Sequence, residues 1–134
     1  MSYHFTSSIE GPMERAVAAT TEALQRHGFG VLTDIDVQAT LKKKLDVAFR
    51  PYRILGACNP EMAYRALQAE DKVGTMLPCN VVLQAMADGH VQVSAVDPVA
   101  SMRAIDNPAL AETAAQVREK LRQVVAELAA AGTA

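Results

Sequence analysis

The chain has 134 residues and a net charge of −2, and 50% of its residues are apolar while 21% are charged. This size and composition are typical of one globular domain that buries its own core without disulfides or metals. The lack of a basic surplus argues against nucleic-acid binding, and no apolar run approaches the ~20 residues of a membrane-spanning helix.

Periodicity and turn residues predict alternating strands and helices along the chain. In chain order the predicted elements are a strand over 3–7, a helix over 12–27, a strand over 29–35, a short helix over 37–45, a strand over 52–57, a helix over 60–69, strands over 81–87 and 91–96, and a long helix over 108–131. The resulting order is β-α-β-(α)-β-α-β-β-α.

Capping and turn residues define the boundaries of these elements. Asn59-Pro60 and Asn107-Pro108 each put asparagine at a helix N-cap and proline at the first helical position. Gly28 suits the left-handed conformation that ends a helix. Asp88-Gly89 is the strongest hairpin signal, and it predicts antiparallel pairing of the last two strands.

The fold predicted from this order is α+β, with one mostly antiparallel five-stranded sheet and helices packed on one face. The last helix carries a long apolar seam formed by Leu110, Ala114, Val117, Leu121, Val124 and Leu128. Ala111, Ala115 and Val125 widen this seam. A seam this long for so small a domain favours a homodimer, although packing on the chain's own sheet would also explain it.

Four segments of the chain resemble the DUF302 family of small bacterial and archaeal proteins. They are His27-Gly28-Phe29, residues 49–56, Ala57-Cys58-Asn59-Pro60 and residues 74–81, and the resemblance runs from about Phe5 to Pro98. It implies a single compact α+β domain over residues 1–134, commonly homodimeric. It implies no reaction, cofactor or substrate.

Both cysteines lie beside a proline and an asparagine, in Cys58-Asn59-Pro60 and in Pro78-Cys79-Asn80. Cys58 precedes a capped helix start, where free N–H groups and the helix dipole stabilise a thiolate. Cys79 starts a predicted strand, and alternation with Val81 points it inward. We expect the two cysteines to lie close together, at one edge of the sheet.

Three interpretations of the two thiols remain open from the sequence. In the first, both are small buried apolar groups, and the neighbouring prolines and asparagines are turn and cap residues. In the second, they line one pocket for redox, persulfide or thiol-transfer chemistry, with Cys58 as the candidate catalytic thiolate. In the third, Cys58 and Cys79 bind a soft metal or heme, although they lack the C-x-x-C spacing typical of such sites.

Arg53 lies on the predicted strand that leads to Cys58. An arginine there could bind an anionic ligand next to the thiol, so the candidate ligand-binding residues are Cys58, Asn59, Pro78, Cys79 and Arg53. A surface ion pair is the favoured alternative for Arg53, with Asp46, Asp34 or Glu61 as its partner.

From these observations we predict a small ligand-binding or interaction module, homodimeric, with a pocket near Cys58 and Cys79. The alternative is a thiol-based redox or sulfur-transfer protein that uses Cys58, or a soft-metal or heme protein. A small-molecule ligand fits the first hypothesis, and no residue pattern names a cofactor. Because no apolar stretch typical of a signal peptide is present, we expect a cytoplasmic protein with reduced cysteines.

Overall fold

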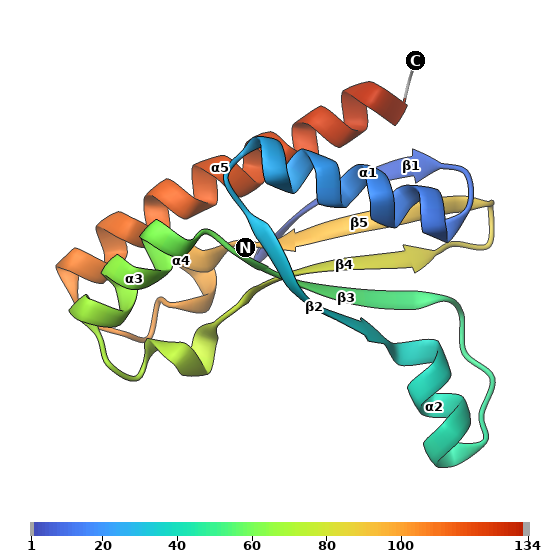
Figure 1. The fold of residues 1–134 in the computed structure, drawn as a ribbon, viewed down its shortest axis with the longest axis horizontal. Coiled ribbons are helices and arrows are strands. Elements are labelled where there is room, and N and C mark those ends of the chain that lie inside the picture. The colour runs from blue at the N-terminus through green and yellow to red at the C-terminus, as the bar shows by residue number, and fades with distance from the viewer. Residues whose placement is uncertain (1, 133–134) are drawn as a thin grey trace.

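Five antiparallel strands form one open sheet in the order β1-β5-β4-β3-β2 in the computed structural model, which describes residues 2–132 (Figure 1). In chain order the elements are β1 (His4–Glu10), α1 (Met13–Arg26), β2 (Gly30–Asp36), α2 (Val37–Leu45), β3 (Tyr52–Cys58), α3 (Pro60–Ala69), a 3-10 turn (Val73–Met76), β4 (Cys79–Ala85), β5 (His90–Val96), α4 (Pro98–Ser101) and α5 (Pro108–Gly132). The predicted α+β class is confirmed. Within residues 2–132, no helix combines the length and apolar character needed to cross a membrane.

The predicted caps and turns act where the sequence placed them. The side chains of Asn59 and Asn107 accept hydrogen bonds from backbone N–H groups in the first turns of α3 and α5. Gly28 and Gly89 have φ values of +86° and +90°, which ends α1 and turns the β4–β5 hairpin. The largest differences from the predicted strand boundaries are that β1 continues to Glu10, and that β4 covers Cys79–Ala85 where the prediction placed this strand over 81–87.

One face of the sheet is covered by α1 and α5 and forms the main core. Alternating side chains of the three central strands are buried there, namely Leu55, Ala57, Cys79, Val81, Leu83, Val91, Val93 and Ala95. The seam of α5 packs against this face, and Leu121, Val124 and Leu128 are almost fully buried. The apolar seam of α5 is therefore buried within the chain itself, so its length does not favour a dimer.

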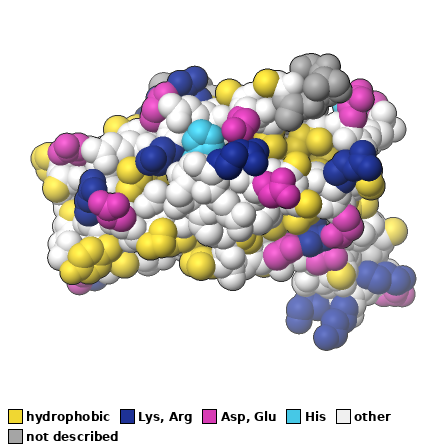
Figure 2. Space-filling view, turned by 45° about the horizontal axis from the view of Figure 1, so that its top comes forward, with side chains coloured by type: hydrophobic (Ala, Val, Ile, Leu, Met, Phe, Trp, Pro, Cys, Tyr) yellow, Lys and Arg dark blue, Asp and Glu magenta, His cyan; other side chains and the backbone are white. Residues whose placement is uncertain are grey.

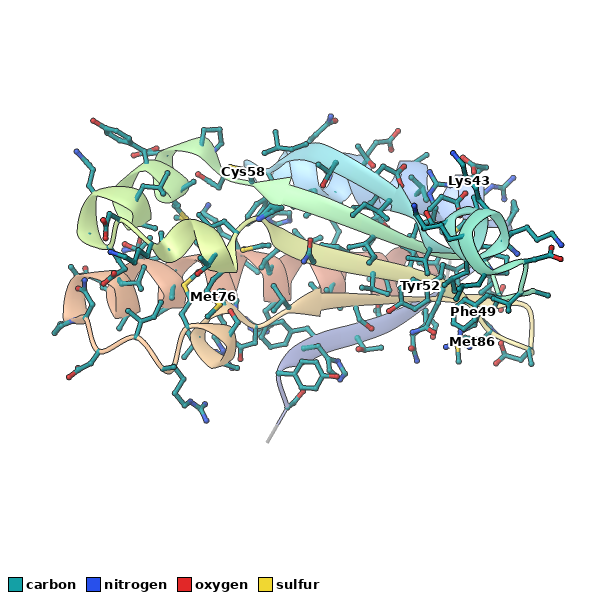
Figure 3. The ribbon with its side chains drawn as sticks, turned by 90° about the horizontal axis from the view of Figure 1, so that it is seen from below. Lys43, Phe49, Tyr52, Cys58, Met76 and Met86 are labelled. Carbon is teal, nitrogen blue, oxygen red and sulfur yellow. The ribbon has the colours of Figure 1, made fainter. Side chains whose placement is uncertain are left out.

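The opposite face of the sheet is not covered by α1 or α5, and it is turned toward the viewer in Figure 3. At one end of the sheet, α3, α4 and the 3-10 turn extend beyond the strands. At the other end, α2 projects away from the domain, toward the side opposite α1 and α5 (Figure 1). None of the residues of α2 is buried.

Candidate ligand pocket

A cavity of about 300 Å³ lies where the end of β3 and the start of β4 meet α3 and α5. Its walls are almost entirely apolar. They are formed by Phe29, Leu32, Ala57, Cys58, Asn59, Met62, Ala63, Ala66, Leu67, Leu77, Pro78, Cys79, Pro98, Met102, Leu110, Thr113, Ala114 and Val117. Both cysteines therefore face one cavity, and Figure 3 marks Cys58 at this end of β3.

Strand register brings the two cysteine segments together. Ala57 pairs with Cys79 and Gly56 pairs with Asn80 across the antiparallel β3–β4 ladder. Cys58 is the last residue of β3, and the chain turns there into α3. Because β3 and β4 are inner strands, the cysteines lie at the end of two central strands and not at an edge of the sheet, which corrects the predicted position.

Gly56 allows the wall of the cavity to form at this junction. A side chain at position 56 would bring its Cβ within 2.7 Å of Pro78 Cγ and closer still to Thr33 Oγ1. The Leu77–Pro78 peptide bond is cis, and Pro78 packs directly over the glycine. Pro78 is thus a packing residue of the cavity wall as well as a turn residue.

The side chain of Asn59 caps helix α3. Its Oδ1 accepts a hydrogen bond from the Met62 backbone N–H at 3.2 Å, which caps α3, while Pro60 occupies the first helical position. The other polar side chain in the wall, Thr113, donates its hydroxyl to the Ala109 carbonyl at 3.3 Å. Both polar side chains of the wall are therefore already hydrogen-bonded within the chain.

The two cysteines are free thiols with different surroundings. Cys79 is 7% exposed, whereas Cys58 is half-buried. Burial, together with a smaller electrostatic contribution from the nearby Cys58, raises the pKa of the Cys79 thiol to about 11. Cys79 is therefore protonated at neutral pH, which is the state of a structural or weakly hydrogen-bonding thiol and not of a nucleophile.

Arg53 does not belong to this cavity. It precedes Cys58 by five residues on an extended strand, a span of about 17 Å. Its guanidinium forms a bidentate ion pair with Asp34 and a second ion pair with Glu14 at 2.9 Å. Asp34 holds the pKa of Arg53 above its ordinary value, and Arg53 in turn lowers the pKa of the Asp34 carboxyl.

The structure adds wall residues that the sequence did not single out. They come from α3, α4 and α5, and Met62, Met102 and Leu110 are examples. Their sequence signal was only apolar helical spacing, which does not separate a cavity wall from a packed core. Ala63, Ala66 and Ala114 explain why the helices leave space, because these small side chains face the cavity.

Metal binding would depend on the two thiols. Among residues 2–132, no three His, Cys, Asp or Glu side chains gather in a way that could hold a metal ion. Cys58 and Cys79 would thus supply two ligands from this chain, fewer than the four protein ligands of a structural zinc site.

The fold and the cavity define a small α+β protein with an open antiparallel sheet and an apolar pocket at one end of it. The profile of the family "Domain of unknown function DUF302" matches residues 3–128, so the chain belongs to the DUF302 family. The crystal structure of an uncharacterized conserved DUF302 protein from Bacillus stearothermophilus is similar, with a TM-score of 0.88 and 29% identity over 96% of this chain and 99% of that one. No curated protein matches the chain. Membership of the family thus brings a fold and no activity.

Proposed function

We propose that this protein binds a small, neutral, largely apolar molecule in the cavity between β3, β4, α3 and α5. The single observation that carries the proposal is a cavity of about 300 Å³ with almost wholly apolar walls. This volume lies at the lower end of the range of small-molecule sites, which are mostly apolar clefts with a few polar groups. Burial of apolar ligand surface against such a wall contributes roughly 25 cal/mol of favourable free energy per Å².

The polar groups of the wall support a neutral ligand over a charged one. Asn59 and Thr113 already use hydrogen bonds within the chain, and the thiol of Cys79 is uncharged at neutral pH. An ionised ligand group buried here would lack a charged partner and would lose its hydration. A hydrocarbon, aromatic or similarly neutral body therefore fits the walls better than an anion or a cation does.

Binding of the uncharged fluorescent probe N-phenyl-1-naphthylamine tests this proposal. We expect wild-type protein to enhance the fluorescence of the probe saturably and to bind the sulfonated analogue anilinonaphthalene sulfonate more weakly. Ala63→Phe fills part of the cavity and should weaken probe binding at least ~10-fold, the effect of losing about 1.4 kcal/mol of binding free energy.

Ala115→Phe is the matched control, because Ala115 is exposed on α5 and does not line the cavity. It should bind the probe as the wild type does, with both variants checked for folding by circular dichroism. Equal binding by a folded Ala63→Phe variant, or no saturable binding by the wild type, would refute the proposal.

A second candidate function is thiol chemistry at Cys58. It is favoured by one observation, the presence of both thiols in one cavity. In this function Cys58 is the reacting thiolate or a soft-metal ligand, and the protonated Cys79 lies beside it. Iodoacetamide labelling of Cys58 against pH is the test, since a reactive thiolate requires an apparent pKa well below the ~8.5 of a free thiol. An apparent pKa at or above that value would exclude this function.

A further inference from the structure

Half of the sulfur-containing residues of this protein line one cavity. The chain has two cysteines and six methionines. Cys58, Cys79, Met62 and Met102 all line the cavity between β3, β4, α3 and α5. They come from the end of β3, the start of β4, the first turn of α3 and the end of α4. Apolar packing accounts for each of these residues singly, but it does not account for their gathering around one space.

Local structure holds three of these residues near one another. Cys58 directly follows Ala57, which pairs with Cys79 across the β3–β4 ladder. Met62 lies in the first turn of α3, where its backbone N–H donates a hydrogen bond to the Asn59 side chain at 3.2 Å. Because Asn59 is the next residue after Cys58, this cap places Met62 within about one helical turn of the thiol. The ladder and the cap therefore bring Cys58, Cys79 and Met62 to the same part of the cavity wall.

Met102 reaches the same cavity from another wall. Cys79 belongs to the main core cluster, whereas Met102 packs in a second, smaller cluster with Leu110, and residues of both clusters line the cavity. Cys79 and Met102 are buried, while Cys58 and Met62 are half-buried. An ion can therefore reach Cys58 and Met62 from solvent, and the other two sulfur-containing side chains lie deeper in the protein.

The side chains of this wall do not suit the common divalent ions. Mg²⁺ and Ca²⁺ require several oxygen ligands, and a structural Zn²⁺ site requires four Cys, His or carboxylate ligands. Among residues 2–132, the wall of the cavity includes no Asp, Glu or His. Acidic and basic side chains are instead interspersed over the outer surface on the side of α1 and α5 (Figure 2). Thiolate and thioether sulfurs are soft ligands, and among the metals of proteins they favour copper(I).

We propose that Cys58, Cys79, Met62 and Met102 form a copper(I) site in this cavity. As the sulfur–copper bond forms, the thiol of Cys58 releases its proton to solvent, so Cu⁺ and one thiolate together carry no net charge. The thioethers of Met62 and Met102 add no charge. A neutral complex fits a wall without charged side chains, whereas a divalent ion would need a second thiolate. The copper site rests on the second function proposed above, and it names the metal and two further ligands for it.

Competition for copper(I) with the chelator bicinchoninate, in the absence of oxygen, tests the proposal. Wild-type protein should take one equivalent of copper(I) from the chelator, and X-ray absorption of the bound copper should show sulfur ligands alone. Cys58→Ser should raise the copper(I) dissociation constant at least ~100-fold, because it removes the anionic ligand. Met62→Leu and Met102→Leu should each raise it about 10-fold, because leucine keeps the apolar volume and removes the thioether.

Met86→Leu is the matched control, because Met86 is exposed, does not line the cavity and lies at the other end of the sheet from Cys58 (Figure 3). It should bind copper(I) as the wild type does. The three Met→Leu variants should still bind N-phenyl-1-naphthylamine, which shows that they are folded and separates this test from that of the apolar ligand. A wild type that binds the probe but not copper(I), oxygen or nitrogen ligands on the bound copper, or equal copper(I) affinity in Met62→Leu and Met86→Leu would each overturn the copper site. Copper(I) binding without probe binding would support the copper site and refute the apolar ligand alone.

Discussion

The two ends of strand β3 place neighbouring residues in opposite environments. At one end Cys58 faces an apolar cavity in which the polar side chains are satisfied locally. At the other end Arg53 is held by two carboxylates, from β2 and from α1. Five residues of extended chain separate these environments, so sequence proximity on a strand does not put two side chains in one site. The candidate site therefore belongs to the thiol end alone.

The largest expected effect concerns Cys79, the thiol with the apolar environment. A pKa of about 11 leaves about one thiol in a thousand ionised at pH 8. In a Cys58→Ser variant, where Cys79 is the remaining thiol, we expect iodoacetamide to label the native protein at least ~100-fold more slowly than the protein unfolded in urea. Quenching the reaction at a series of times and measuring the labelled fraction by mass spectrometry gives both rates.

The Cys79→Ser variant is the matched comparison, because the remaining thiol of Cys58 is half-buried and lines the same cavity in the native state. Saturating N-phenyl-1-naphthylamine should slow its labelling in the native protein and not in urea. Rapid labelling of Cys79 in the native Cys58→Ser variant would show that the thiol end is open to water, and the contrast between the ends of β3 would then fail.

The elements around β3 could be predicted from the sequence because the cap and turn residues that define them act locally. Asn59-Pro60 caps α3 and Asp88-Gly89 turns the hairpin, and each acts through residues within one turn. The end of β1 was placed three residues too early because Ser8–Glu10 are strand through pairing with β5, whose partner residues lie 80 to 84 positions further along the chain. Local propensity does not contain that information.

The candidate site was predictable only in part, for the same physical reason. Adjacent motifs suggested that Cys58 and Cys79 meet, and strand pairing does bring them to one cavity. The walls from α3 and α5 depend on which small residues, such as Ala63 and Ala114, line the cavity, and this is a property of helix packing. Arg53 could not be separated from the site without the register that places Asp34 beside it.

The next largest effect is that of a side chain at Gly56, which lies against Pro78 of the cavity wall. Gly56→Ala places a Cβ against Thr33 and Pro78 and should destabilise the protein by about 1–3 kcal/mol, since overpacking forces neighbours to move. Urea unfolding followed by circular dichroism measures the change. Gly30→Ala on β2 is the control, because nothing lies within 4 Å of its added Cβ, and it should leave stability unchanged or slightly increased.

A Gly56→Ala protein as stable as the Gly30→Ala protein would mean that the junction of β3 and Pro78 has room to relax. The cavity wall would then rearrange at little free-energy cost. This result would contradict the preformed pocket on which the proposed ligand binding depends. Reduced binding of N-phenyl-1-naphthylamine by a folded Gly56→Ala variant is the expected companion result, because the displaced Pro78 lines the same cavity.

The smallest effect is expected at the charged end of β3. Arg53→Gln removes the ion pairs with Asp34 and Glu14 and should cost about 1 kcal/mol, because both carboxylates are partly or largely exposed and solvent screens them. Arg53 lowers the pKa of the Asp34 carboxyl, so this stabilisation is present above the ordinary pKa of about 3.9 and is lost as pH falls through the lowered value. The difference in unfolding free energy between the two proteins should therefore have its full size at pH 6 and shrink below about pH 4.

Denaturation curves at pH 6 and pH 3 measure this difference. Probe binding at pH 6 should be unchanged, because Arg53 does not line the cavity. A loss of probe binding in a folded Arg53→Gln variant would instead show that both ends of β3 contribute to one binding site.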